Sequence, residues 1–165
     1  MKLVQSFRVV TLWTAACFAA SVGATDFPKE GKYDHTACWA GASTVVSFSK
    51  THNGGSYEFT GTTVSNPRGG IFDKWSFHCA GSWATFDKKF IGMVTCVELN
   101  LDGDKLLTFF RAGDDRKYVR ETIAGTGKFE GIVMQSKLED LGPFPAVKPG
   151  NFQGCNHQTG TYKLK

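Results

Sequence analysis

The chain has 165 residues, of which 41% are hydrophobic and 21% are charged, with 19 Lys and Arg residues against 15 Asp and Glu residues. The formal net charge of +4 is spread without a basic run or an acidic tail, so nucleic acid and anionic surfaces are not expected as partners. The length suits one domain with one hydrophobic core.

Residues 1–24 have the features of a signal peptide. Two basic residues precede an apolar run, and Val22 and Ala24 stand three residues and one residue before the expected cleavage site. The run is shorter than the roughly 20 apolar residues of a membrane span. A rival interpretation makes Cys17 a lipidated N-terminus. We expect the mature chain, residues 25–165, to form one secreted or periplasmic domain without a transmembrane segment.

The rest of the chain has the pattern of an all-β protein. Short runs rich in Val, Thr and aromatic residues alternate with clusters of Gly, Asn, Asp and Pro, and 19 glycines disfavour helix. Turn chemistry marks HNGGS (52–56), NPRGG (66–70), LDGDK (101–105) and AGDDR (112–116). The eight expected strands cover residues 36–49, 55–64, 71–86, 90–99, 105–111, 117–123, 128–138 and 152–164. They predict a single antiparallel β-barrel.

The stretch IAGTGKFEGIV, residues 123–133, is rich in glycine but is not a dinucleotide-binding loop. Its glycines follow G-x-G-x-x-x-G rather than G-x-G-x-x-G, and no helix start follows them. We expect Gly125 and Gly127 to supply positive φ angles in a turn. Gly131 is expected to form a bulge or a close backbone approach in the next strand.

The same glycine-rich segment resembles the G-T-G-x-[FY]-x-G hairpin of allene oxide cyclase-like and dirigent-like barrels. The mature chain also resembles secreted bacterial proteins that carry this motif and a terminal G-x-Y strand, here Gly160 to Tyr162. The resemblance implies an eight-stranded barrel. In the two named families it implies an interior that holds an apolar organic molecule and directs or catalyses its cyclisation or coupling.

The four cysteines of the expected mature chain predict two disulfides that brace the barrel. Strands joined by a two-residue turn at Asp87-Lys88 place opposite each other residues whose numbers sum to 175, as those of Cys79 and Cys96 do. By elimination Cys38 pairs with Cys155, which ties the first strand to the last, where the barrel must close. None has Cys-x-x-Cys spacing, so a zinc or redox site is disfavoured.

The third expected strand decides whether the barrel is hollow. Its residues alternate between a small, partly polar face and a bulky face of Trp75, Phe77, Cys79, Gly81 and Trp83. If the small face lines the lumen there is room for a ligand, whereas a bulky lining fills the interior. The polar residues on expected strands that we consider as lumen and ligand-binding candidates are His78, Glu98, Arg120 and His157.

Common catalytic and metal motifs are not found. Asn100, Asp102 and Asp104 begin like a calcium loop, but Lys105 stands where that loop needs Gly. The histidines lack metal-ligand spacing, and no G-x-S-x-G elbow is present. We therefore expect no metal site, no cofactor and no hydrolytic triad.

Two classes of function are compatible with this pattern. The favoured one is non-catalytic: binding of a small apolar molecule, or an envelope or host-facing interaction module. The alternative is an isomerase-like (cyclase) or stereochemistry-directing enzyme that acts on an apolar organic substrate. A closed interior pocket with a buried charged residue would favour catalysis, and a dry, filled barrel a structural or interaction role.

Overall fold

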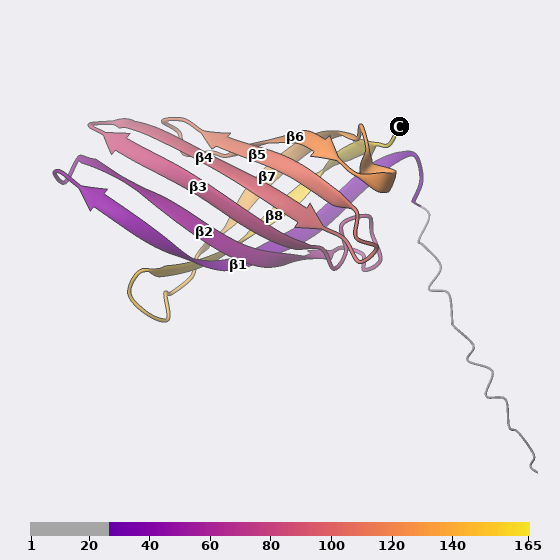
Figure 1. The fold of residues 1–165 in the computed structure, drawn as a ribbon, viewed down its shortest axis with the longest axis horizontal. Coiled ribbons are helices and arrows are strands. Elements are labelled where there is room, and N and C mark those ends of the chain that lie inside the picture. Colours follow the sequence, from indigo (N-terminus) through magenta and orange to yellow (C-terminus); the bar gives the residue numbers. More distant parts are fainter. Residues whose placement is uncertain (1–26) are drawn as a thin grey trace, which may run out of the picture.

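The computed structural model describes residues 27–165, so the predicted signal peptide lies outside the described residues. Eight antiparallel strands form one sheet that curls into a nearly closed barrel (Figure 1), which confirms the predicted fold class. Within residues 27–165, no helix is long and apolar enough to cross a membrane. The strands are Glu30–Ser47 (β1), His52–Ser65 (β2), Ser76–Phe86 (β3), Lys89–Leu99 (β4), Lys105–Ala112 (β5), Val119–Gly125 (β6), Val133–Pro143 (β7) and Asn151–Lys163 (β8).

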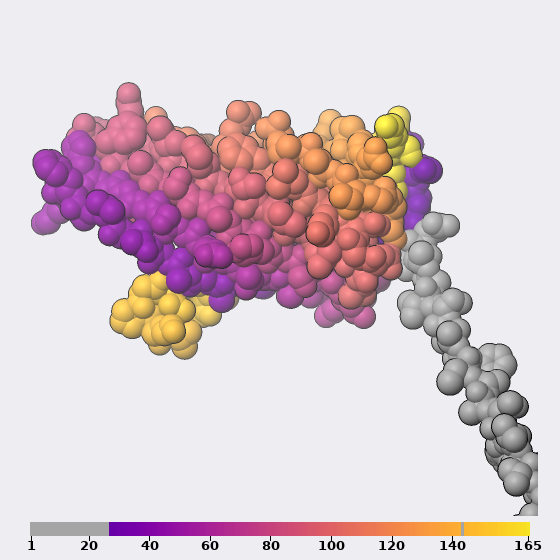
Figure 2. Space-filling model, in the orientation of Figure 1, coloured from indigo at the N-terminus to yellow at the C-terminus, as the bar shows by residue number. Residues whose placement is uncertain are grey.

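The sheet runs in the order β6-β5-β4-β3-β2-β1-β8-β7. Its edges are β6 and β7, which no described backbone ladder joins and which the short 3₁₀ turn Gly127–Phe129 (η1) connects. We call the end at which β1 begins and β8 ends the closed end, and the opposite end the open end. Both ends of the described chain lie at the closed end (Figure 1), whereas the β7–β8 connection stands out from the barrel body (Figure 2).

Apolar side chains plug the closed end. Phe72, Leu106 and Phe129 are at most 1% exposed, and the Trp75 ring meets Phe72 and Phe129 edge-on. The Trp75 Nε1–H donates to the carbonyl oxygen of Ile71 at 2.9 Å. Fully burying one such large side chain stabilises the fold by about 1.5 to 3 kcal/mol, so this plug is a main part of the core.

The plug corrects the third predicted strand. β3 begins at Ser76 rather than at residue 71, and the preceding residues form turns at the closed end of the barrel. Ile71 and Phe72 are adjacent and both are buried. A strand in a barrel wall points neighbouring side chains to opposite faces, so only a turn can bury both.

The glycines of HNGGS correct the first predicted turn. The β1–β2 loop consists of residues 48–51, and HNGGS lies within β2. A Cβ atom at Gly55 would collide with the Thr44 carbonyl oxygen and approach the Trp83 ring nitrogen to 3.1 Å. Glycine here permits close approach within the sheet rather than a turn. The turns predicted at 66–70, 101–105 and 112–116 are confirmed.

The segment after β6 differs from its predicted form. Gly127 has a positive φ of 55°, as predicted, but Gly125 does not; a Cβ atom there would collide with the Phe129 carbonyl oxygen. Gly131, with φ of 68°, lies in the turn before β7 rather than in a strand. The strand expected from residue 128 therefore starts at Val133, because η1 occupies the first residues.

Both predicted disulfides are confirmed. Cys79 lies opposite Cys96 across β3 and β4, and Cys38 lies opposite Cys155 across β1 and β8, with a Cα–Cα distance of 4.1 Å in each pair. The first faces the interior and the second the outside. The predicted place of barrel closure is wrong, however, because β1 and β8 share a continuous ladder while the seam lies between β6 and β7.

Gly127→Val tests the turn that spans the seam. A Cβ atom at Gly127 would meet the Asp104 carboxylate, and valine is strained at a positive φ. We expect a loss of about 1 to 3 kcal/mol in unfolding free energy, measured by urea denaturation. Gly113→Val is the control, since nothing lies within 4 Å of a Cβ atom at that position. An equal effect of the two substitutions would contradict this explanation.

Removal of the outer disulfide tests the tie between the first and last strands. The bridged residues are 117 apart in sequence, so on the chain-entropy model the Cys38→Ser and Cys155→Ser double variant should lose roughly 4 to 5 kcal/mol. Urea denaturation of oxidised protein measures the loss. Non-reducing peptide mapping checks the pairing, and recovery of a Cys38 to Cys79 peptide would refute it.

Candidate ligand-binding cavity

The open half of the barrel encloses a cavity of about 850 Å³. This volume is in the range of pockets that hold small organic molecules. Aromatic rings line its wall, and several contact one another, with centroid distances such as 5.9 Å between Phe59 and Phe152. The aromatic lining residues are Trp39, Tyr57, Phe59, Phe77, Trp83, Phe110, Tyr118 and Phe152.

Glycines opposite the aromatic residues explain why bulky side chains leave a hollow. Tyr57 pairs with Gly81 across β2 and β3, and Trp39 pairs with Gly154 across β1 and β8. A Cβ atom would lie 2.6 Å from the Tyr57 ring at Gly81 and 2.8 Å from the Trp39 ring at Gly154. The rings therefore lie along the neighbouring strand rather than across the lumen.

This arrangement corrects the two alternatives drawn from the third strand. Its bulky face does point inward, since Cys79 is buried and Phe77 and Trp83 line the cavity. A bulky lining was expected to fill the interior. Instead, the interior is filled at the closed end and hollow in the open half, because the aromatic rings of the open half rest on glycines.

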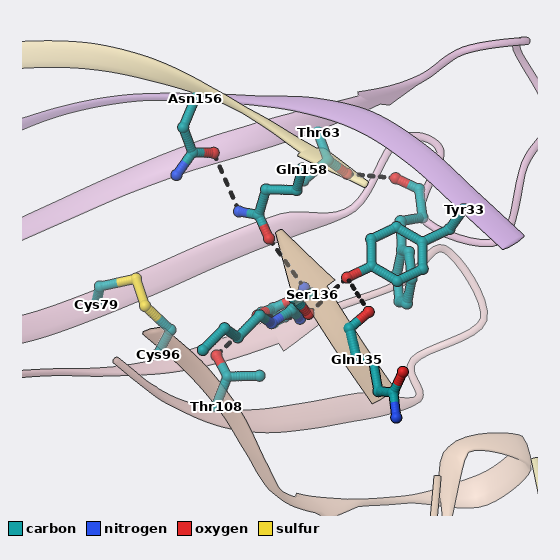
Figure 3. Close-up of polar contacts among 12 residues, drawn as sticks. Tyr33, Thr63, Cys79, Cys96, Thr108, Gln135, Ser136, Asn156 and Gln158 are labelled. Atoms are coloured by element: carbon teal, nitrogen blue, oxygen red, sulfur yellow. Dashed lines mark hydrogen bonds and ion pairs between the residues drawn. A yellow bond between two sulfur atoms is a disulfide. The ribbon is translucent and has the colours of Figure 1, made fainter. Parts of the chain in front are cut away.

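A buried ion pair lies at the floor of the cavity. The Arg120 guanidinium donates to both Glu98 carboxylate oxygens at 2.8 and 2.9 Å and to the Gln158 side-chain oxygen at 3.1 Å. Figure 3 labels Gln158 and Thr108 of this cluster. The Thr108 hydroxyl donates to Glu98 at 2.8 Å. The Arg120 and Glu98 side chains are 1% and 10% exposed. These residues come from β4, β5, β6 and β8, so the cluster connects edge strand β6 to the rest of the wall.

The structure separates the four predicted lumen residues into two groups. Glu98 lines the cavity and Arg120 is buried beside it. His78 and His157 instead lie on the outer face, where their Nε2 atoms are 2.6 Å from Glu58 and 2.9 Å from Asp34.

Strand parity is the reason for this correction. His78 directly precedes the inward Cys79. His157 stands between Asn156 and Gln158, which are buried and line the cavity. Neighbouring residues on a strand point to opposite faces, so both histidines must face outward.

His35 is a lumen residue that the sequence analysis missed. It lines the cavity, is 2% exposed, and packs against the rings of Tyr33 and Phe72 with centroid distances of 5.6 and 5.3 Å. Its Nδ1 atom has no hydrogen-bond partner within residues 27–165. Burial, together with the positive charge of Arg120, lowers the pKa of His35 to about 3. The ring is therefore neutral near pH 7. Its alternation with Tyr33 and Ala37 along β1 is the signal that marks it as inward.

Two tyrosines lie nearer the open end. The hydroxyl oxygens of Tyr57 and Tyr118 are 3.2 Å apart, and the Tyr57 hydroxyl also donates to the Met93 carbonyl oxygen at 3.3 Å. Burial raises the pKa of Tyr57, and the hydrogen bond to Tyr118 adds to this. The phenol is therefore protonated near pH 7. Lys117 and Asp140 supply one charge of each sign to the cavity lining.

The described residues offer structural uses for the motifs weighed as metal sites. No group of three or more His, Cys, Asp or Glu residues within 27–165 is arranged to hold a metal ion. In the calcium-like segment, the Asn100 side-chain oxygen accepts hydrogen bonds from the Asp102 and Asp104 amides at 2.9 and 2.8 Å. Lys128 forms an ion pair with Asp102, so this loop is a braced hairpin turn.

Comparison with known proteins adds no family to this picture. A scan against protein-family models found no match, and searches of curated proteins and of solved structures returned none either. The geometry of the cavity is thus the basis for proposing a function.

The buried neutral His35 should make the fold sensitive to acid. The unfolded chain binds a proton at this histidine below about pH 6.5, whereas the folded protein does so only near its pKa of about 3. The contribution of neutral His35 is thus full above pH 6.5 and is lost as the pH falls toward 3. From pH 7.5 to pH 4.5 the wild type should lose about 2 to 3 kcal/mol more unfolding free energy than His35→Gln.

Urea denaturation at both pH values measures this difference. His78→Gln is the control, because it removes a histidine from the outer face, where water reaches the ring in both states. Parallel pH profiles of wild type and His35→Gln would contradict the prediction.

Proposed function

We propose that this protein binds a small, mainly apolar molecule in the aromatic cavity and does so without chemical conversion. The observation that carries the proposal is the cavity of about 850 Å³ with its aromatic walls. Apolar ligand surface transferred from water to such a wall gains about 25 cal/mol per Å². The paired charge at the floor and the tyrosine hydroxyls near the open end add points at which polar groups can be oriented.

We further propose that the protein works in the periplasm or outside the cell. The two disulfides agree with an oxidising compartment, and the signal-peptide pattern of residues 1–24 agrees with export.

An interaction module, the other non-catalytic role, is supported by a different surface. Outward side chains of β4 form an apolar stripe, and the outer faces of β2 to β5 are seen in Figure 2. The stripe residues are 40 to 48% exposed and are Ile91, Met93, Val97 and Leu99. Such a face is compatible with a protein partner, but it does not explain the cavity.

A cyclase-like or stereochemistry-directing enzyme is the second candidate. It is favoured by an interior pocket with buried charged residues, the feature expected above of a catalyst. The two buried charges, Glu98 and Arg120, are paired with each other, so a free general base at the floor would have to be His35. Because this pairing occupies the buried charges, binding without conversion is the first proposal. A relationship to the allene oxide cyclase-like and dirigent-like barrels belongs to this proposal and rests on residues 125–131.

Blocking the cavity tests the binding proposal. Ser43 lines the cavity, whereas its neighbour Thr44 is exposed on the opposite face of β1. We expect Ser43→Trp to weaken binding of the neutral dye N-phenylnaphthylamine at least about tenfold, and Thr44→Trp to leave it unchanged. Fluorescence titration measures both.

Native mass spectrometry of wild type from its own host should also retain a small molecule that Ser43→Trp lacks. Equal dye binding by both variants would show that the cavity is not the binding site. If this small molecule is incubated with the protein and is recovered in a chemically different form, the result would favour the enzyme instead.

A further inference from the structure

Two polar side chains, His35 and Asn156, lie at the floor of the cavity beside the buried ion pair. Asn156 is 9% exposed and lines the cavity, as His35 does. Neither the buried ion pair nor the aromatic wall accounts for the hydrogen-bonding capacity of these two side chains. We infer that the ligand carries an uncharged hydroxyl group, which binds at this floor between His35 and Asn156. The inference rests on the proposed binding function and specifies the ligand class.

Strand register brings the two side chains together. His35 on β1 pairs with Gln158 on β8, and Ala37 pairs with Asn156. His35 and Asn156 are thus diagonal neighbours on the inner face, about 7 to 8 Å apart between Cα atoms in such an arrangement. Ala37, the next inward residue on β1 and the partner of Asn156, has a small side chain and also lines the cavity. The register therefore leaves room for a small polar group between the imidazole and the amide.

The hydrogen-bond donors and acceptors of His35 and Asn156 favour a ligand group that can both donate and accept. The Asn156 side-chain oxygen already accepts from the Gln158 amide at 3.0 Å (Figure 3), so its NH₂ group is the part left to donate. A neutral imidazole has one donor and one acceptor nitrogen, and Nδ1 of His35 has no partner within residues 27–165. A hydroxyl group can accept from Asn156 and can either donate to the acceptor nitrogen of the imidazole or accept from its donor nitrogen, whereas a ketone or an ether can only accept.

The charges at the floor disfavour an ionised ligand. Glu98 and Arg120 neutralise each other through two hydrogen bonds, and the neutral His35 adds no charge. Both Glu98 oxygens already accept from Arg120, so the ion pair leaves no charge at the floor to pair with a ligand carboxylate or ammonium. The other charged groups of the cavity are Lys117 and Asp140. Lys117 lies in the loop between β5 and β6, and Asp140 lies near the end of strand β7, so both are toward the open end. Desolvating an ion that has no partner is unfavourable, so a neutral head group is selected.

Three probes of the same length test the inference at pH 7.5. Phenylhexanol, phenylhexanoate and phenylhexylamine are titrated against bound N-phenylnaphthylamine, with phenylhexane as the neutral reference. We expect the alcohol to bind at least about tenfold tighter than the carboxylate, the amine and the hydrocarbon. His35→Phe, which keeps a ring against Tyr33 and Phe72, and Asn156→Leu should each remove most of the advantage over the hydrocarbon.

Controls keep the result decisive. His78→Phe changes the same residue type on the outer face and should keep the alcohol preference, and circular dichroism verifies that each variant is folded. If the dye binds but the alcohol has no advantage, or a charged probe binds best, the inference is overturned while the binding function stands. If neither the dye nor any probe binds the wild type, both fail. Should one floor variant not fold, the other variant and the wild-type ranking still decide.

Discussion

The buried ion pair of Glu98 and Arg120 is the interaction on which the barrel depends. Strand β6 is an edge of the sheet and has no described ladder to β7, so Arg120 anchors it through Glu98 on β4 and Gln158 on β8. Burying two charges costs several kcal/mol per ion, and good geometry with additional hydrogen bonds offsets this cost. Loss of either partner would leave a charge buried at the point where the filled and hollow halves meet.

Above this pair, the hollow half persists because of a repeated pairing of glycine with aromatic residues. An eight-stranded barrel has an interior only just wide enough for its own side chains to fill. Where Gly81 faces Tyr57 and Gly154 faces Trp39, the ring occupies the space of the missing Cβ atom. The wall thus gains aromatic surface without using the volume of the lumen, and the plug at the closed end supplies the packed core that the open half lacks.

Features set by local geometry could be predicted from the sequence, and features set by the fold could not. The two-residue turn at Asp87-Lys88 fixes the β3–β4 register and hence the disulfide Cys79–Cys96. Glu98, two residues after Cys96, follows by the same parity. The same parity excludes His78 from the lumen, because it directly precedes the inward Cys79. The alternation of His35 with Tyr33 and Ala37 marks it as inward, but its packing against Phe72 and the plug at residues 71–75 depend on segments that meet only in the closed barrel.

The positions of the two ends of the described chain determine which way the open end of the barrel points when the protein is attached to another molecule. β1 starts and β8 finishes at the closed end (Figure 1), and near them Lys29 donates to the Lys165 carbonyl oxygen at 2.8 Å. A tether, a tag or a neighbouring domain joined at residue 27 or at Lys165 would therefore hold the molecule by its closed end. The open end would point away from the attachment point and would stay accessible to molecules arriving from solution.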